Sequence, residues 1–184
     1  MIFLYNRKYN FIWLESMRIV TWNIGGGIKY GGEKEDKEYL LKTVSLINPD
    51  IVCLQESHIN VVRSLAKDIF SEKFEYISEY PISVSHNDPA YQLALTILSK
   101  KKIDESRIYM LENPKLSRVL DSGKTIYSHD KGIQEVRIED IYVANVQLLP
   151  LHVFKTTYDE QPKLSHSIDN FILSNLHTPL IFLW

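Results

Sequence analysis

The run Asp50–Glu56 (DIVCLQE) constrains the fold most, because it places four apolar residues in succession between polar ends. A continuous apolar strand needs cover on both faces, so this run predicts a buried strand inside a layered α/β domain. Arg18–Gly27 (RIVTWNIGGG) predicts a second short buried strand. That strand opens into a glycine loop, whose backbone can come close to a ligand.

Two apolar patterns of helical spacing lie on either side of the Asp50–Glu56 strand. They consist of Leu40, Leu41, Val44 and Ile47 before it, and of Val62, Leu65, Ala66 and Ile69 after it. Asn48-Pro49 ends the first helix. The beginning of the chain therefore predicts the order strand, helix, strand, helix.

The rest of the chain predicts further short strands and a third helix. The strands are expected at residues 74–80, 93–99, 107–111, 125–127, 133–138, 141–148 and 178–184. Glu139-Asp140 makes a tight turn, so the two strands around it form a hairpin. The third helix carries Leu164, Ile168, Phe171 and Ile172.

The bulk properties fit one domain with one sizeable core. The chain has 184 residues and a formal net charge of −2, which gives no electrostatic case for wholesale attraction to nucleic acid or membranes. No run approaches the roughly 20 apolar residues of a membrane span. The single cysteine, Cys53, lies in an apolar run and predicts a buried thiol in a reducing compartment, hence a cytoplasmic location.

The first sixteen residues are aromatic and apolar but interrupted by polar side chains. Met17 stands directly before the first clear strand. We therefore expect residues 1–16 to be an extension outside a domain of residues 17–184, with Met17 as the natural start. An extra edge strand or helix packed on the domain is the alternative.

Asn23 and Glu56 stand where the two early strands end. The carboxyl edge of a layered sheet is where ligands bind. A carboxylate after four apolar residues must be exposed, paired or bound to a cation. From the residues alone, a turn-forming role explains Asn23 as well as a role at a ligand site does. In the same way, a solvated carboxylate at the start of a loop explains Glu56 as well as a bound cation does.

Together these runs resemble the first two motifs of the endonuclease/exonuclease/phosphatase superfamily of metal-dependent phosphoesterases, strands that end in T-W-N and in L-Q-E. LALTILSK (93–100), GIQEVRIEDIYVANVQL (132–148) and TPLIFLW (178–184) resemble later motifs of that family. The resemblance covers about Arg18 to Trp184. It implies a four-layer α/β sandwich of the DNase-like type, in which helices flank two packed sheets and the site lies at one mouth.

The resemblance also implies roles for individual residues. Glu56 would be the main protein ligand of Mg²⁺ (or Mn²⁺), and Asn23 would orient the metal shell or the phosphate. Mg²⁺ prefers oxygen ligands and keeps several waters, so one or two protein groups suffice. Tyr91 lies with residues 86–88 in a loop where the family often places substrate contacts, and a turn explains that loop equally well.

Asn145-Val146-Gln147-Leu148 stands where many members have N-x-H-L. Asn145 is then a candidate substrate contact. Gln147 can hydrogen-bond a phosphate oxygen but cannot donate a proton as a charged histidine does. His152, five residues later, is a candidate substitute, and a loop histidine beside Pro150 is the alternative.

The family's later D-x-N and S-D-H motifs have no counterpart in this sequence. The resemblance therefore implies a fold that is incomplete at its C-terminus and holds part of an active site. We expect such a chain to be a weak catalyst and to self-associate through the apolar edge at residues 178–184.

The predicted function is a metal-dependent phosphoester hydrolase, a nuclease or phosphatase whose substrate is a phosphoester, with nucleic acid as one candidate. The alternative is a catalytically inactive fragment or a binding-only relative. We interpret three further features as structural. His58 is expected as an exposed first-turn histidine, with a place at the site as the alternative. Lys100–Lys102 is expected as a solvated strand end, with contact to a nucleic-acid backbone as the alternative, and Arg137 as a partner of Glu135.

Overall fold

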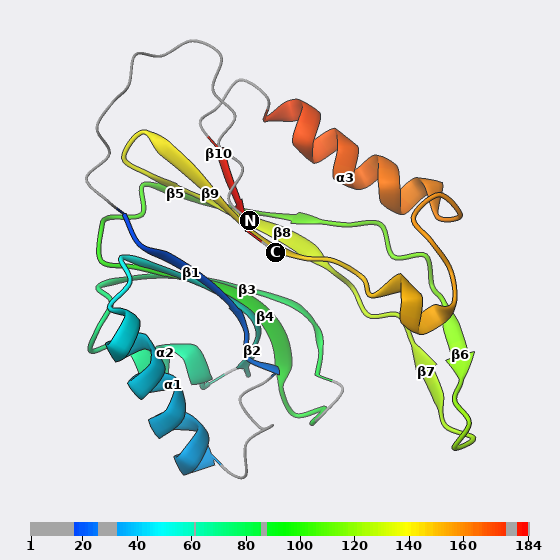
Figure 1. Cartoon of the computed structure of the whole chain (residues 1–184), viewed down its shortest axis with the longest axis horizontal. Coiled ribbons are helices and arrows are strands. Elements are labelled where there is room, and N and C mark those ends of the chain that lie inside the picture. Colours follow the sequence, from blue (N-terminus) through cyan, green and yellow to red (C-terminus); the bar gives the residue numbers. More distant parts are fainter. Residues whose placement is uncertain (1–16, 26–32, 61, 86–87, 176–179, 184) are drawn as a thin grey trace.

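The computed structural model describes residues 17–25, 33–60, 62–85, 88–175 and 180–183 (Figure 1). In this part of the chain, two four-stranded sheets pack face to face and helices cover both outer faces. The predicted four-layer α/β sandwich is confirmed. The predictions made for residues 1–16, His86, Asn87 and Trp184 lie outside the described residues.

The first sheet has the order β1-β2-β4-β3. Its strands are β1 (Ile19–Asn23), β2 (Ile51–Ile59), β4 (Gln92–Ser99) and β3 (Tyr76–Val84). β1 and β2 are parallel and α1 (Glu33–Ile47) connects them, whereas β4 runs antiparallel to both of its neighbours. The predicted order strand, helix, strand is confirmed.

The second sheet has the order β10-β9-β8-β5. Its strands are β10 (Leu180–Leu183), β9 (Ile141–Gln147), β8 (Gly132–Ile138) and β5 (Glu105–Met110). β8 and β9 form the predicted hairpin, with Ile138 paired to Ile141 across the turn. A separate hairpin of β6 (Ser117–Val119) and β7 (Thr125–Tyr127) stands beside the sheets (Figure 1).

Three apolar layers hold these elements together. The first lies between the first sheet and the helices α1 and α2 (Leu65–Phe70), and the second lies between the two sheets. The third lies between the second sheet, α3 (Pro162–Ser174) and the short 3₁₀ helix η2 (Leu151–Phe154). Cys53 belongs to the inter-sheet layer, which confirms the predicted buried thiol. Burying one Leu, Ile or Phe side chain contributes about 1.5–3 kcal/mol, so these layers fix the sheets against each other.

His58 was expected on the surface, and this expectation is wrong. β2 does not end at Glu56 but continues to Ile59, so His58 is buried in the strand. Its Nε2 lies 2.8 Å from Ser85 Oγ. Val62 was expected on the apolar face of the second helix, but α2 begins only at Leu65 and Val62 is exposed.

Arg137 does not pair with Glu135. In the β5–β8 register, Arg137 lies opposite Glu105 and Glu135 lies opposite Arg107, so each ion pair crosses to β5. Residues two apart on one strand point to the same face of the sheet, but each is closer to the residue directly opposite on the adjacent strand than to the other. None of the described helices is long and apolar enough to cross a membrane.

Candidate active site

Glu56 lies at a β-bulge and not at a strand end. The register of β2 against β4 shifts between Gln55 and Ser57, and Glu56 has φ 54°. A residue other than glycine pays roughly 1–2 kcal/mol in this left-handed region. Bulges re-aim side chains and are common beside active sites, where backbone strain also gathers. The bulge therefore singles out Glu56, although the expectation that β2 ends there is corrected.

Gln147, the last residue of β9, reaches Glu56 from the opposite sheet. Its Nε2 donates a hydrogen bond to Glu56 Oε1 over 2.9 Å. Its Oε1 is buried and has no hydrogen-bond partner within the described residues. Gln147 therefore presents a neutral amide that holds the Glu56 carboxylate.

Lys131 adds a positive charge to this pair. It directly precedes Gly132, which is the register partner of Gln147, and its side chain is buried. Burial lowers the pKa of Lys131, and the nearby Glu56 carboxylate raises it. Sequence reasoning missed this residue, because Lys131 lies just outside the paired positions of the hairpin and has the pattern of a loop lysine.

Asn23 ends β1 next to β2, with Gln55 as its register partner. Its Oδ1 accepts a hydrogen bond from Gly25 N over 2.9 Å, which is the geometry of a local turn. The residue therefore serves as a turn former and also lies on the strand adjacent to the Glu56 bulge.

Asn145 is not placed to touch a substrate. It is fully buried between the sheets, where its Nδ2 donates to the carbonyl oxygens of Leu54 and Thr96 and its Oδ1 accepts from Gln55 Nε2. Its expected substrate contact is therefore corrected. The reason is geometric: Asn145 lies two residues inside the end of β9, where the two sheets already cover its side chain.

The other two candidates, Tyr91 and His152, form no hydrogen bond with the Glu56 carboxylate in the described structure. Tyr91 is half-buried and stacks on His58 with ring centroids 5.2 Å apart. His152 is exposed on η2, and no hydrogen bond or ion pair joins it to Glu56 or Gln147 in the described structure. Their roles in a site stay predictions.

The donor set limits what a cation would find here. The described residues hold no group of three or more His, Cys, Asp or Glu side chains that surrounds a metal ion. A cation at Glu56 would be coordinated by one carboxylate, neighbouring amide oxygens and water. This sparse oxygen set fits Mg²⁺, which keeps several waters, better than metals that need closed protein cages.

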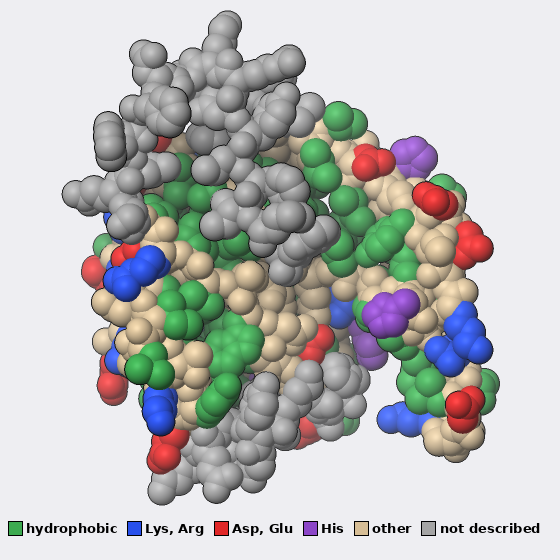
Figure 2. Space-filling view, viewed as in Figure 1, with side chains coloured by type: hydrophobic (Ala, Val, Ile, Leu, Met, Phe, Trp, Pro, Cys, Tyr) green, Lys and Arg blue, Asp and Glu red, His purple; other side chains and the backbone are tan. Residues whose placement is uncertain are grey.

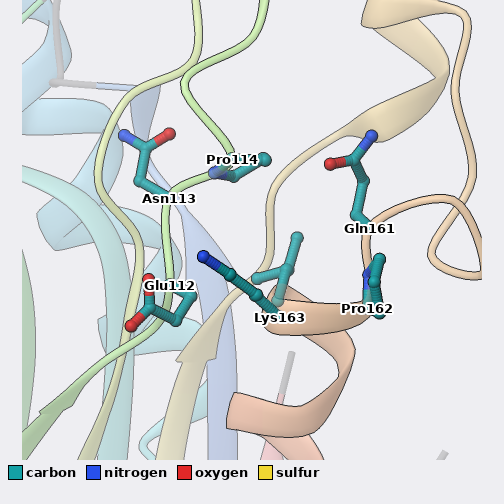
Figure 3. A pocket seen from close by; sticks show the side chains of 7 residues that line it. Glu112, Asn113, Pro114, Gln161, Pro162 and Lys163 are labelled. Atoms are coloured by element: carbon teal, nitrogen blue, oxygen red, sulfur yellow. The ribbon is translucent and has the colours of Figure 1, made fainter.

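The described face of the molecule in Figure 2 has no single sign of charge. Basic and acidic side chains are scattered over the visible face, which is hollowed beside the β6–β7 hairpin (Figure 2). A separate cavity of about 270 Å³ lies between residues 112–114 and the start of α3 at residues 161–164 (Figure 3). None of the expected site residues lines that cavity.

Residues 20–127 match the sequence profile of the Endonuclease/Exonuclease/phosphatase family. The chain belongs to this family. No curated protein gives a significant match.

Solved structures agree on the fold. An endonuclease/exonuclease/phosphatase from Beutenbergia cavernae DSM 12333 is similar with a TM-score of 0.57 and 16% identity, covering 83% of this chain and 43% of that one. The human Nocturnin catalytic domain with bound sulfate is similar with a TM-score of 0.51 and 18% identity, covering 90% of this chain and 62% of that one. A humanized D. rerio TDP2 is similar with a TM-score of 0.51 and 15% identity, covering 90% of this chain and 64% of that one. The chain thus spans 43–64% of the length of these structures, and the likeness at such identities concerns the fold.

Proposed function

We propose that this protein is a metal-dependent phosphoester hydrolase whose cation binds at Glu56. The observation that carries the proposal is a hydrogen bond between a carboxylate and an amide from two sheets, within electrostatic reach of a buried lysine. Glu56 and Gln147 share a hydrogen bond, and Lys131 interacts electrostatically with Glu56. The family supports the reaction class, because its name covers nucleases and phosphatases.

Each residue has a distinct task in this proposal. Glu56 holds Mg²⁺ or Mn²⁺, with Asn23 orienting its water shell from the adjacent strand. When bound, the cation polarises the scissile phosphate and offsets the charge that builds up as water attacks. Lys131 supplies a second positive charge for a phosphate oxygen, and Gln147 keeps the Glu56 carboxylate in place.

The substrate class is a small phosphoester or a short nucleic-acid strand. The net charge of −2 and the mixed surface of Figure 2 disfavour tight, sequence-independent binding of long nucleic acid. The sulfate in the Nocturnin structure supports an oxyanion as the bound group. The buried free thiol of Cys53 supports action in a reducing, cytoplasmic compartment.

Hydrolysis of bis-p-nitrophenyl phosphate and p-nitrophenyl phosphate in Mg²⁺ tests the proposal. We expect a weak activity that EDTA abolishes and that Glu56→Gln and Lys131→Met each reduce by about 10²–10³-fold or to background, as loss of a charge-stabilising group does elsewhere. Lys124→Met, on the exposed turn of the β6–β7 hairpin, is the matched control and should keep wild-type activity.

Two results would count against the proposal. Hydrolysis that persists in EDTA or in Glu56→Gln would remove the cation site from the reaction. Cation binding without any hydrolysis would instead favour a binding-only relative, to which the amide at Gln147 is suited because it cannot donate a proton as histidine does.

A further inference from the structure

Two buried amides meet between the sheets directly beside the candidate site. Gln55 Nε2 donates to Asn145 Oδ1 over 2.5 Å and to Thr21 Oγ1 over 2.9 Å. Gln55 is 4% exposed and Asn145 0%. The Gln55 carboxamide thus links β1, β2 and β9 at the position immediately before Glu56.

Asn145 also contacts the backbone of both strands, β2 and β4, that form the bulge. Its Nδ2 donates to Leu54 O over 2.9 Å and to Thr96 O over 3.3 Å. Leu54 and Thr96 are register partners in β2 and β4, and the register shift follows after the next pair, Gln55 and Leu95. One side chain from the second sheet therefore holds the two first-sheet strands where the Glu56 bulge begins.

The spacing of these contacts joins them to the site. Gln147 lies two residues beyond Asn145 on the same face of β9, and it reaches Glu56, two residues beyond Leu54. β9 thus contacts β2 twice, through Asn145 at Leu54 and through Gln147 at Glu56. Shifting β9 would leave buried amide and carbonyl groups without partners, at a cost of about 1–3 kcal/mol for each group.

We infer that Gln55 and Asn145 are positioning residues that hold the Glu56 carboxylate in its cation-binding geometry. The inference rests on the proposed function of Glu56 as the cation ligand. The left-handed backbone at Glu56 is unfavourable by itself, so neighbouring contacts must impose it, and these two amides make contacts at that place. Residues that orient a metal ligand typically change metal affinity by about 10–100-fold when removed.

The test compares Gln55→Met and Asn145→Leu with Thr96→Val. Thr96 is the matched control because its buried hydroxyl also forms a network, with Ser57 Oγ at 2.7 Å and Glu79 Oε1 at 3.0 Å. Replacing that side chain leaves Thr96 O available to Asn145. Each folded variant is titrated with Mn²⁺, the electron paramagnetic resonance spectrum of the bound ion is recorded, and the Gln147 side-chain amide is followed by NMR.

We expect Gln55→Met and Asn145→Leu to weaken Mn²⁺ binding by about 10–100-fold, to change the spectrum of bound Mn²⁺ and to shift the Gln147 amide signal. Thr96→Val should lose stability but keep all three properties. If Asn145→Leu does not fold, Gln55→Met decides alone, since it retains both Asn145 bonds to backbone carbonyls.

Wild-type affinity, spectrum and amide signal in folded Gln55→Met would overturn the inference. A wild-type chain that binds no Mn²⁺ would overturn the proposed function instead. In that case the Gln147 amide signal still decides whether the two buried amides position Glu56.

Discussion

Glu56 and Gln147 are 91 positions apart in the sequence, yet Gln147 Nε2 lies 2.9 Å from Glu56 Oε1. The two residues come from different sheets, β2 and β9. Their contact exists only when the inter-sheet layer is packed, so the site depends directly on the stability of the fold.

The backbone at Glu56 predicts an unusual order of stability among its variants. Alanine is normally preferred to glycine in a strand by roughly 0.5–1 kcal/mol. At φ 54° the order should reverse, because only glycine enters the left-handed region without a steric cost. We expect Glu56→Gly to be more stable than Glu56→Ala by about 1 kcal/mol in urea unfolding.

Ser57 provides the comparison, because it is the next residue of the same strand and does not have a positive φ. Ser57→Ala should be more stable than Ser57→Gly. The ordinary order at both positions would mean that the bulge is absent in solution.

The ion pair between Arg107 and Glu135 predicts a pH-dependent loss of stability. Arg107 Nε donates to Glu135 Oε1 over 2.6 Å, and the Glu135 side chain is 1% exposed. Burial raises the pKa of Glu135 above its usual 4.5, and Arg107 lowers it. A raised pKa in the folded state favours folding below pH 4.5, and this contribution is lost as the pH rises through the folded-state value.

Arg107→Ala should therefore raise the pKa of Glu135 further and leave its carboxylate without a compensating charge at neutral pH. We expect the free energy of unfolding of Arg107→Ala to be lower than that of the wild type by about 2 kcal/mol at neutral pH, and by less near pH 5. The loss is smaller than for a fully buried pair because Arg107 is half exposed. Urea unfolding at both pH values measures it. Arg137→Ala, which loses a pair with the exposed Glu105, is the control; equal deficits for Arg107→Ala at both pH values would contradict the account.

The burial of Cys53 predicts that its thiol reacts only when the chain unfolds. It lies between the sheets at 0% exposure, and burial raises the pKa of its thiol far above the ordinary value. The folded chain should therefore not react with Ellman's reagent at pH 8, since the thiolate is the reactive form. Labelling should require unfolding and speed up with urea, whereas immediate labelling of one thiol per native chain would show that the layer is open.

Hydrophobic pattern was sufficient to predict much of the fold. The Ile51–Leu54 run, the helical spacing before it and the turn at Glu139-Asp140 all describe local chemistry, and the structure confirms each of them. Glu56 was expected at the end of β2 because a polar pair follows four apolar residues. No residue in LQESHI indicates a positive φ, since a glycine is absent, so the bulge and the burial of His58 beyond it could not be predicted.

The parts of the site that sequence missed depend on which strands become neighbours. Lys131 looks like an ordinary loop lysine in the sequence, and only the folded structure buries it within electrostatic reach of Glu56. Asn145 was expected to face a substrate, but the packing of the sheets encloses it. The proposed start at Met17 and the expected self-association through residues 178–184 stay predictions.

Calorimetric titration of Mg²⁺ and Mn²⁺ tests the central claim, that Glu56 is the cation ligand, most directly. It needs the wild-type chain, Glu56→Gln and the control Glu72→Gln, which removes an exposed carboxylate in the turn after α2. Hard cations bind anionic oxygen most strongly, and Glu56 is the carboxylate that Gln147 and Lys131 approach. The account predicts binding to the wild type and to Glu72→Gln, and at least about 10-fold weaker binding to Glu56→Gln. Equal affinity of Glu56→Gln and the wild type would contradict it.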